Sequence, residues 1–199
     1  MSEEGEWGLT RGKLLGNRPD FDIDKWRKKY QETERKIKEG GVVVLRGTSS
    51  TGKTEILQGL KNKSELRVVS WDWQLYGYLL EDFEREGREL FWSAVAFELG
   101  LEQEVKGEED FWGEIDRLKQ ETEASDQRLV FLFDEVQILP SKGCDKAVAW
   151  QKKWIEGLHK RGIGAVEVLV EMGEGRNLED FYANLDNVLV LDMNECLRQ

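Results

Sequence analysis

The sequence predicts an α/β fold in which helices cover both faces of a central, mostly parallel sheet of five strands. Short apolar runs of strand length alternate along the chain with longer segments whose apolar residues recur at helical spacing. Strands that alternate with helices form parallel sheets covered on both faces, because each crossover helix packs back on the sheet. With 199 residues, the chain is long enough for one such three-layer domain.

Five runs have the length and composition expected of buried strands. They are apolar, rich in β-branched or aromatic residues, and short, as strands covered on both faces are. In chain order they are Val42–Leu45, Leu66–Trp71, Leu129–Phe133, Ala165–Val170 and Val188–Leu191.

Five other segments show helical periodicity, and several of them end at a glycine that can act as a C-cap. We expect helices at Ile23–Glu39, about Lys53–Leu60, Glu89–Leu99, Glu108–Ala124 and Asp145–Arg161. The acidic, glycine-rich residues 1–16 are expected to form a flexible or peripheral arm. Residues 17–199 then form one domain, since no linker or repeat interrupts them.

Composition and charge narrow the classes of function. The formal net charge is −11, and a polyanion disfavours broad attachment to nucleic acid, although this does not exclude a local basic groove. Apolar runs of strand length predict no membrane span, and the acidic N-terminus lacks the features of a signal peptide. Cys144 and Cys196 form no disulfide framework, nor a metal site with the single His159. We therefore expect a cytoplasmic protein.

A glycine-rich loop follows the first predicted strand and matches the phosphate-binding pattern G-x-x-x-x-G-K-[ST] in full. Its glycines let the backbone close around phosphates, and the N-terminus of the following helix presents N–H groups to them. Lys53 is expected to reach the β- and γ-phosphates, and Thr54 to bind Mg²⁺. A Gly-Ser-Thr surface turn is the alternative interpretation. The residues expected to bind ATP are Gly47, Thr48, Ser49, Ser50, Thr51, Gly52, Lys53 and Thr54.

Two adjacent carboxylates follow the third predicted strand. Asp134 would end a buried strand beside the phosphate-binding loop, where the hydration shell of Mg²⁺ needs an acceptor. Glu135 points differently at the strand end and is expected to act as the base that polarises the attacking water. An acidic pair that only caps the next turn is the alternative interpretation.

Taken together, these motifs resemble the P-loop ATPases that carry an additional catalytic glutamate. Residues 134–137, Asp-Glu-Val-Gln, and the helix spacing resemble more narrowly the archaeal ATPases related to the AAA-type and signal-transduction (STAND) groups. The resemblance covers about residues 17–194 and implies a three-layer α/β/α P-loop NTPase with sheet order 5-1-4-3-2. The family usually continues into a helical lid and a winged-helix domain, whereas this sequence stops just after its fifth strand. An obvious arginine finger is also missing.

The same resemblance implies further site residues. A polar residue after the fourth strand would sense the γ-phosphate, and Arg176 or Asn177 is favoured over Glu171 for this role; a solvated loop is the alternative. Residues 17–20, including Arg18, would hold the adenine base. Gln137 would contact the attacking water or a partner, or would simply begin the next loop.

Basic and aromatic residues also alternate in residues 26–30 and 151–154, as they do in single-strand binders. Because these aromatic residues share the apolar stripe of their helices, core packing with a solvated basic face is the favoured interpretation.

The function predicted is Mg-dependent ATP binding and hydrolysis that drives a conformational or assembly switch, with a protein partner or a homo-oligomer as the target. A nucleic-acid motor, either a ring-forming DNA translocase or a helicase-like ATPase, is the first alternative. A small-molecule kinase is the second, although Arg161, Arg176 and Arg198 are too scattered to form its lid. A binding module that rarely hydrolyses nucleotide is disfavoured by the intact Lys53 and Glu135.

Overall fold

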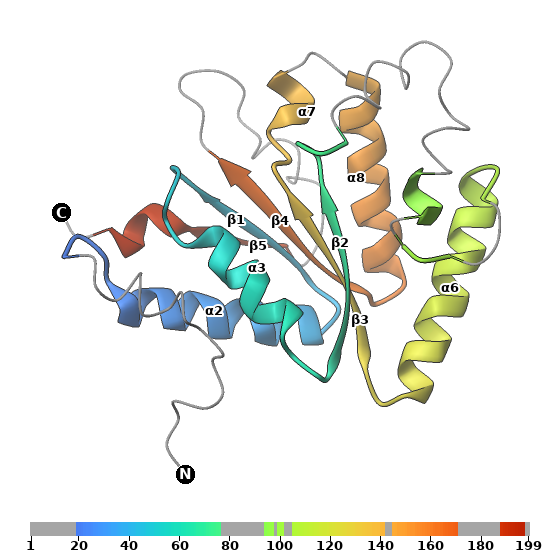
Figure 1. Ribbon diagram of the computed structural model, residues 1–199, viewed down its shortest axis with the longest axis horizontal. Coiled ribbons are helices and arrows are strands. Elements are labelled where there is room, and N and C mark those ends of the chain that lie inside the picture. Colours follow the sequence, from blue (N-terminus) through green and yellow to red (C-terminus); the bar gives the residue numbers. More distant parts are fainter. Residues whose placement is uncertain are drawn as a thin grey trace.

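The computed structural model describes residues 19–76, 94–97, 99–101, 105–141, 145–170 and 188–197. Its centre is a five-stranded sheet in which every pair of neighbouring strands is parallel. The strand order is β2-β3-β4-β1-β5 (Figure 1), which is the predicted order 5-1-4-3-2 read from the other edge. The predicted fold class is confirmed. The strands are β1 Val42–Gly47, β2 Leu66–Asp72, β3 Arg128–Asp134, β4 Gly164–Val170 and β5 Val188–Asp192.

Each strand contains its predicted apolar run and extends it by one or two residues. Four of the strands gain a glycine or an aspartate at the carboxyl end, because the backbone ladder continues past the apolar residues. Carboxyl ends of parallel strands share one edge of the sheet, which is where α/β folds place their sites. The residues added there are Gly47, Asp72, Asp134 and Asp192.

Four described helices match predicted ones to within one residue. The Asp22 side chain caps the first of them by accepting a hydrogen bond from the backbone N–H of Lys25 at 3.1 Å. The short helix α7 was not predicted, and most of the predicted helix Glu89–Leu99 lies outside the described residues. No helix in the described ranges has the length and apolar composition that a membrane crossing requires. The helices are α2 Ile23–Lys38, α3 Lys53–Lys61, α6 Glu108–Ala124, α7 Ile138–Ser141 and α8 Asp145–Lys160.

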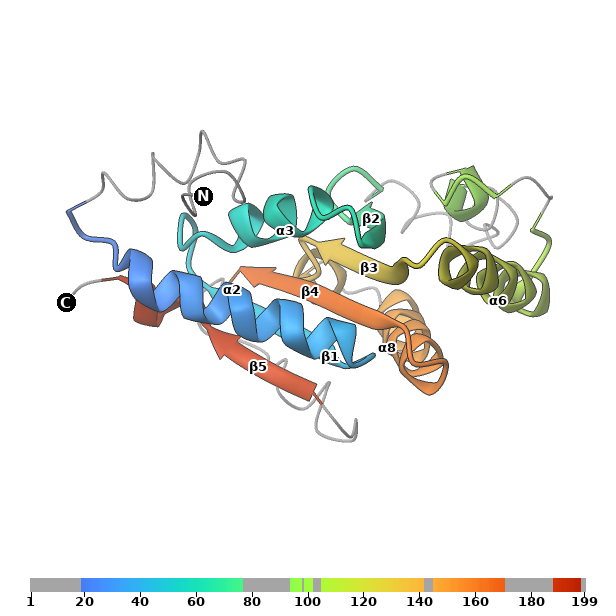
Figure 2. The same cartoon turned by 90° about the horizontal axis from the view of Figure 1, so that it is seen from below.

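The two faces of the sheet are packed into two separate apolar cores (Figure 1, Figure 2). Successive side chains of a strand point to opposite faces. In β1, Val43 and Leu45 accordingly join α2 and α3, whereas Val42 and Val44 join α6 and α8. All four are at most 2% exposed, so this strand lies at the centre of the three layers.

Aromatic side chains dominate the core on the side of α6 and α8. Trp154 of α8 is 1% exposed, and its ring centroid lies 4.9 Å from that of Phe133 and 5.4 Å from that of Phe111. On the other face, Trp26 and Tyr30 of α2 are equally buried. The core-packing interpretation of both basic-aromatic segments is therefore correct, and these rings are not available for stacking on nucleic-acid bases.

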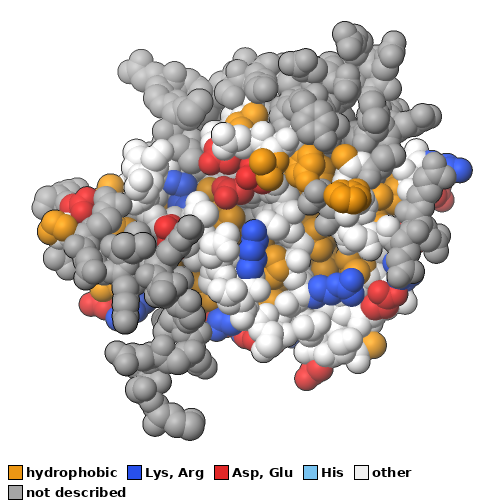
Figure 3. All heavy atoms as spheres, viewed as in Figure 1, with side chains coloured by type: hydrophobic (Ala, Val, Ile, Leu, Met, Phe, Trp, Pro, Cys, Tyr) orange, Lys and Arg blue, Asp and Glu red, His pale blue; other side chains and the backbone are white. Residues whose placement is uncertain are grey.

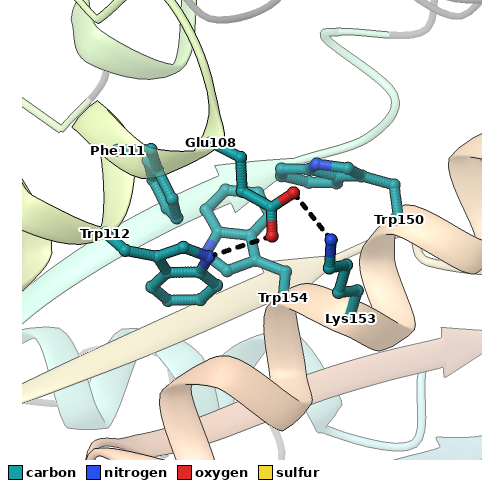
Figure 4. A pocket seen from close by; sticks show the side chains of 6 residues that line it. All are labelled: Glu108, Phe111, Trp112, Trp150, Lys153 and Trp154. Atoms are coloured by element: carbon teal, nitrogen blue, oxygen red, sulfur yellow. Dashed lines mark hydrogen bonds and ion pairs between the residues drawn. The ribbon is translucent and has the colours of Figure 1, made fainter.

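An aromatic pocket lies between α6 and α8, and it is bordered by an ion pair between Glu108 and Lys153 (Figure 4). Glu108 accepts hydrogen bonds from the ammonium of Lys153 at 2.6 Å and from the indole N–H of Trp112 at 3.3 Å. The Lys153 ammonium holds the pKa of Glu108 below its ordinary value. Arg161 lies over the Trp112 ring at 4.3 Å, so this indole also makes a cation–π contact.

Two helical glycines should respond in opposite ways to substitution by alanine. A Cβ at Gly59 of α3 would lie 2.6 Å from the ring of Tyr30, which is buried and cannot move aside. Gly59→Ala is expected to lower the free energy of unfolding by about 1–2 kcal/mol, because overpacking outweighs the better helix propensity. A Cβ at Gly113 of α6 meets nothing within 4 Å. Gly113→Ala is expected to raise the free energy of unfolding by about 0.5–1 kcal/mol.

Equilibrium unfolding in urea measures both variants under the same conditions. A stabilised Gly59→Ala variant would contradict the tight packing of α3 on α2.

Candidate active site

The loop between β1 and α3 is held in a shape that only glycine permits at its end. Gly52 has φ +85°, and a Cβ there would lie 2.6 Å from Nε1 of Trp26. The indole N–H of Trp26 donates to the carbonyl of Gly52 at 3.0 Å. This hydrogen bond ties the N-terminus of α3 to α2.

Lys53, the first residue of α3, folds back over this loop. Its ammonium donates to the carbonyls of Gly47 at 2.8 Å and Thr48 at 2.6 Å, and to the hydroxyl of Thr51 at 3.1 Å. The side chain is 5% exposed, so the charge is held within the turn. Thr54, the next residue, is exposed in the first turn of α3. The loop thus combines a fixed cation, a hydroxyl and the N-terminus of a helix, which together suit an anion.

The chain is pinned on both sides where β3 ends. The carbonyl of Asp134 accepts from the N–H of Trp73 at 3.1 Å, and the N–H of Val136 donates to the carbonyl of Val168 at 3.2 Å. Between these two contacts, Glu135 has φ +55°, a left-handed conformation that a glutamate rarely adopts. Such conformations cluster at functional sites, where the surrounding structure maintains them.

Three carboxylates meet at this edge. Asp72 ends β2 directly beside Asp134 in the register of the two strands, and Glu135 follows. Burial raises the pKa of Asp134 above its ordinary value, and the charges of Glu135 and Asp72 add to that effect. Figure 3 shows acidic side chains gathered on the surface near the carboxyl ends of the strands, next to a hydrophobic patch.

Gln137 is 7% exposed, and its side-chain amide donates a hydrogen bond to the Glu135 carboxylate. From the sequence, Gln137 had three possible roles: contact with the attacking water, contact with a partner, or the start of the next loop. The structure places its amide on Glu135, which restricts the rotamers of that carboxylate.

The two halves of the site lie on the same edge of the sheet. β4 separates β1 from β3, so the loop that starts at Gly47 and the carboxylate of Glu135 are about two strand spacings, roughly 10 Å, apart. The predicted residues Arg18, Arg176 and Asn177 lie outside the described residues, as does Glu171.

The donors at this edge suit Mg²⁺, which needs few protein ligands, better than a metal ion that takes all of its ligands from the protein. Within the described ranges, no group of three or more His, Cys, Asp or Glu side chains could hold a metal ion. Mg²⁺ usually takes only one or two carboxylates from the protein and completes its shell with phosphate and water oxygens. The hydroxyl of Thr54 and the carboxylate of Asp134 match that requirement.

Asn194 belongs to the site and was missed in the sequence. It lies in the 3₁₀ helix η2, Met193–Cys196, which follows β5. Its side-chain oxygen accepts from the backbone N–H of Thr48 at 2.8 Å and from the Thr48 hydroxyl at 2.9 Å. These residues are 146 positions apart, and no motif links them.

Two solved structures have a similar fold over most of this chain. PCH-2 from C. elegans matches with a TM-score of 0.51 and 14% identity, over 93% of this chain and 47% of its own length. Cdc6p from Pyrobaculum aerophilum matches with a TM-score of 0.50 and 14% identity, over 95% and 49%. Both are AAA+ ATPases. The chain has the three-layer α/β/α fold of P-loop NTPases.

The predicted resemblance to AAA-type ATPases is therefore confirmed at the level of the fold. This chain spans about half the length of the two AAA+ structures. No protein-family model matches the sequence. No curated protein sequence matches it either.

The raised pKa of Asp134 predicts that the free energy of unfolding depends on pH. Between the ordinary and the raised pKa, the folded chain binds a proton that the unfolded chain does not. The stability that this group contributes is therefore lost as pH rises through that window. At neutral pH, the ionised carboxylate lowers the free energy of unfolding. Asp134→Asn is expected to raise the melting temperature at pH 7 by a few degrees. Below the ordinary aspartate pKa, that gain should disappear.

Thermal unfolding followed by circular dichroism across this pH range measures the effect. Asp24→Asn, a substitution of an exposed aspartate on α2, is the matched control and should change little at either end. A lower melting temperature for Asp134→Asn at pH 7 would show that the carboxylate is net stabilising.

Proposed function

We propose that this protein binds Mg-ATP at residues 47–54 and hydrolyses it with Glu135 as the base. The observation that carries the proposal is the shared edge of the sheet. The Lys53 ammonium in the glycine-rich loop and the Asp134–Glu135 pair at the end of β3 both lie at that edge, where they would reach one bound nucleotide. The AAA-type fold supports it, because that fold brings a phosphate-binding loop and an acidic strand end together.

Each residue has a chemical role in this proposal. The Lys53 ammonium would move from the carbonyls of its own loop to the β- and γ-phosphate oxygens. Thr54 and Asp134 would hold Mg²⁺, which neutralises charge on the phosphates when bound. The Glu135 carboxylate would take a proton from the water that attacks the γ-phosphate, and ADP would leave with the broken bond's electron pair. Gln137 would hold that carboxylate in place.

Arg176 and Asn177 remain predicted sensors of the γ-phosphate, and Arg18 remains a predicted adenine contact. ATP binding by Lys53 and hydrolysis by Glu135, as proposed, require neither role.

We further propose that hydrolysis drives a switch on a protein partner or within a homo-oligomer. Burial of Trp26, Tyr30 and Trp154 removes the sequence feature that favoured single-stranded nucleic acid, and the net charge of −11 disfavours nonspecific binding to it. A ring-forming translocase would still supply its arginine from a neighbouring subunit, so DNA belongs in the test.

The test is steady-state Mg-ATP hydrolysis over a range of protein concentrations, with and without single- and double-stranded DNA. Turnover that is indifferent to DNA supports the protein-directed switch. Stimulation by DNA that rises with protein concentration would point to an oligomeric motor instead. Absence of both ATP binding and hydrolysis would overturn the ATPase assignment. Phosphate transfer to an added metabolite would indicate a kinase.

A further inference from the structure

Asn194 reaches the phosphate-binding loop at Thr48, the residue directly after β1. One side-chain oxygen accepts both the N–H and the hydroxyl of Thr48, at 2.8 and 2.9 Å. Gly47 makes this approach possible, since a Cβ there would lie 3.2 Å from both the backbone nitrogen and the side-chain oxygen of Asn194. Because a backbone N–H can only donate, the contacting atom of the amide must be its oxygen.

Asn194 is itself held in position by neighbouring residues of β5 and β1. Its N–H donates to the Asp192 carboxylate at 2.9 Å, and the other oxygen of Asp192 lies 3.8 Å from the Arg46 guanidinium. Asp192 and Arg46 are neighbours in the register of β5 and β1. The next turn is tied to the start of α2, because the N–H of Asp22 donates to the carbonyl of Cys196 at 2.7 Å.

Thr48 is therefore bound from two directions. Asn194 holds its N–H and hydroxyl, while its carbonyl accepts from the Lys53 ammonium at 2.6 Å and from the Thr51 hydroxyl at 3.0 Å. A loop fixed at this residue loses less conformational freedom when it closes on a ligand, so ordering costs less of the binding free energy.

We propose that Asn194 is a positioning residue of the nucleotide site, which pre-orders the loop through Thr48 and couples ATP affinity to the segment after β5. This inference rests on the proposed function, because it assigns a regulator to the same site. By linkage, a contact that strengthens ATP binding must in turn be strengthened by ATP. ATP should accordingly slow amide exchange in residues 193–197, and any partner that displaces this segment should weaken ATP binding.

The test combines amide hydrogen exchange at Thr48 with calorimetric titration of ATP, both on the full chain. In Asn194→Ala, which removes the acceptor of both Thr48 hydrogen bonds, the Thr48 amide should exchange faster and the Kd for ATP should rise about tenfold. The kcat at saturating ATP should stay within about twofold, because the contact acts on binding and not on the reacting groups.

Two further variants separate this role from general loosening of the segment. Glu195→Ala removes the neighbouring carboxylate, which is 64% exposed and pairs with the Lys29 ammonium of α2 at 2.8 Å, and should bind ATP like the wild type. Asn194→Asp keeps the acceptor for Thr48, so the slow exchange of the Thr48 amide should be retained.

The outcomes distinguish the two proposals. If the wild type binds no ATP, the proposed function is wrong. If the wild type binds ATP and Asn194→Ala binds it equally well or more tightly, only the role of Asn194 is wrong.

Discussion

Lys53→Ala is expected to reduce Mg-ATP hydrolysis by at least about a hundredfold and to remove measurable ATP binding. Hydrogen bonds to a charged group contribute about 1.5–3 kcal/mol each, and an ammonium that turns from the loop acceptors to the phosphates can donate up to three. The substitution also leaves the carbonyls of Gly47 and Thr48 without their cation. The loop that binds the triphosphate would then lose both its charge and its internal support.

Calorimetric titration with ATP and a phosphate-release assay measure the two effects. Lys53→Arg should fail as well, because a planar guanidinium does not fit where a compact ammonium donates to three acceptors within a tight turn. Lys28→Ala, in which an exposed lysine of α2 is replaced, is the control for loss of one positive charge. Retention of ATP binding in Lys53→Ala would mean that the nucleotide binds elsewhere.

Glu135→Gln is expected to keep ATP bound while lowering kcat by about 10²–10⁴-fold, the range contributed by a positioned general base. Glutamine has the same shape as glutamate and can still contact Gln137, but its amide does not accept a proton at neutral pH. Affinity for ATP should therefore stay close to that of the wild type, and the complex should accumulate unhydrolysed nucleotide.

Single-turnover hydrolysis with bound ATP separates chemistry from binding in this variant. Glu109→Gln removes an exposed carboxylate in the first turn of α6 and should hydrolyse ATP normally. Normal hydrolysis by Glu135→Gln would show that another group activates the water, with Asp72 beside Asp134 as the first residue to test.

The strands and helices could be predicted because their signals are local. Strands buried on both faces are nearly continuous apolar runs, and each predicted run lies within an observed strand. The strand ends were harder to predict, since Asp72 and Asp192 are polar and continue the ladder only because neighbouring strands bind them. The short helix α7 has too few residues to show a period.

The candidate site likewise contains residues that could be predicted from local motifs and residues that could not. Gly47–Thr54 and the Asp134–Glu135 pair are contiguous motifs, so their spacing alone indicated the chemistry. Asn194 and Trp26, which hold the two ends of the loop, carry no such signal. Their partners become neighbours only through packing of η2 and α2 against the loop.

By itself, the sequence determined the α/β class, the positions of the buried strands, and the loop and carboxylates proposed to act on ATP, because periodicity and contiguous motifs are local properties of the chain. Tertiary structure decided which distant groups support them: Asn194 on Thr48, Trp26 on Gly52, and Asp72 beside Asp134. The physical reason is that hydrogen bonds and charge interactions act over a few ångströms, and residues far apart in the chain come that close only when the sheet and its two helical layers assemble.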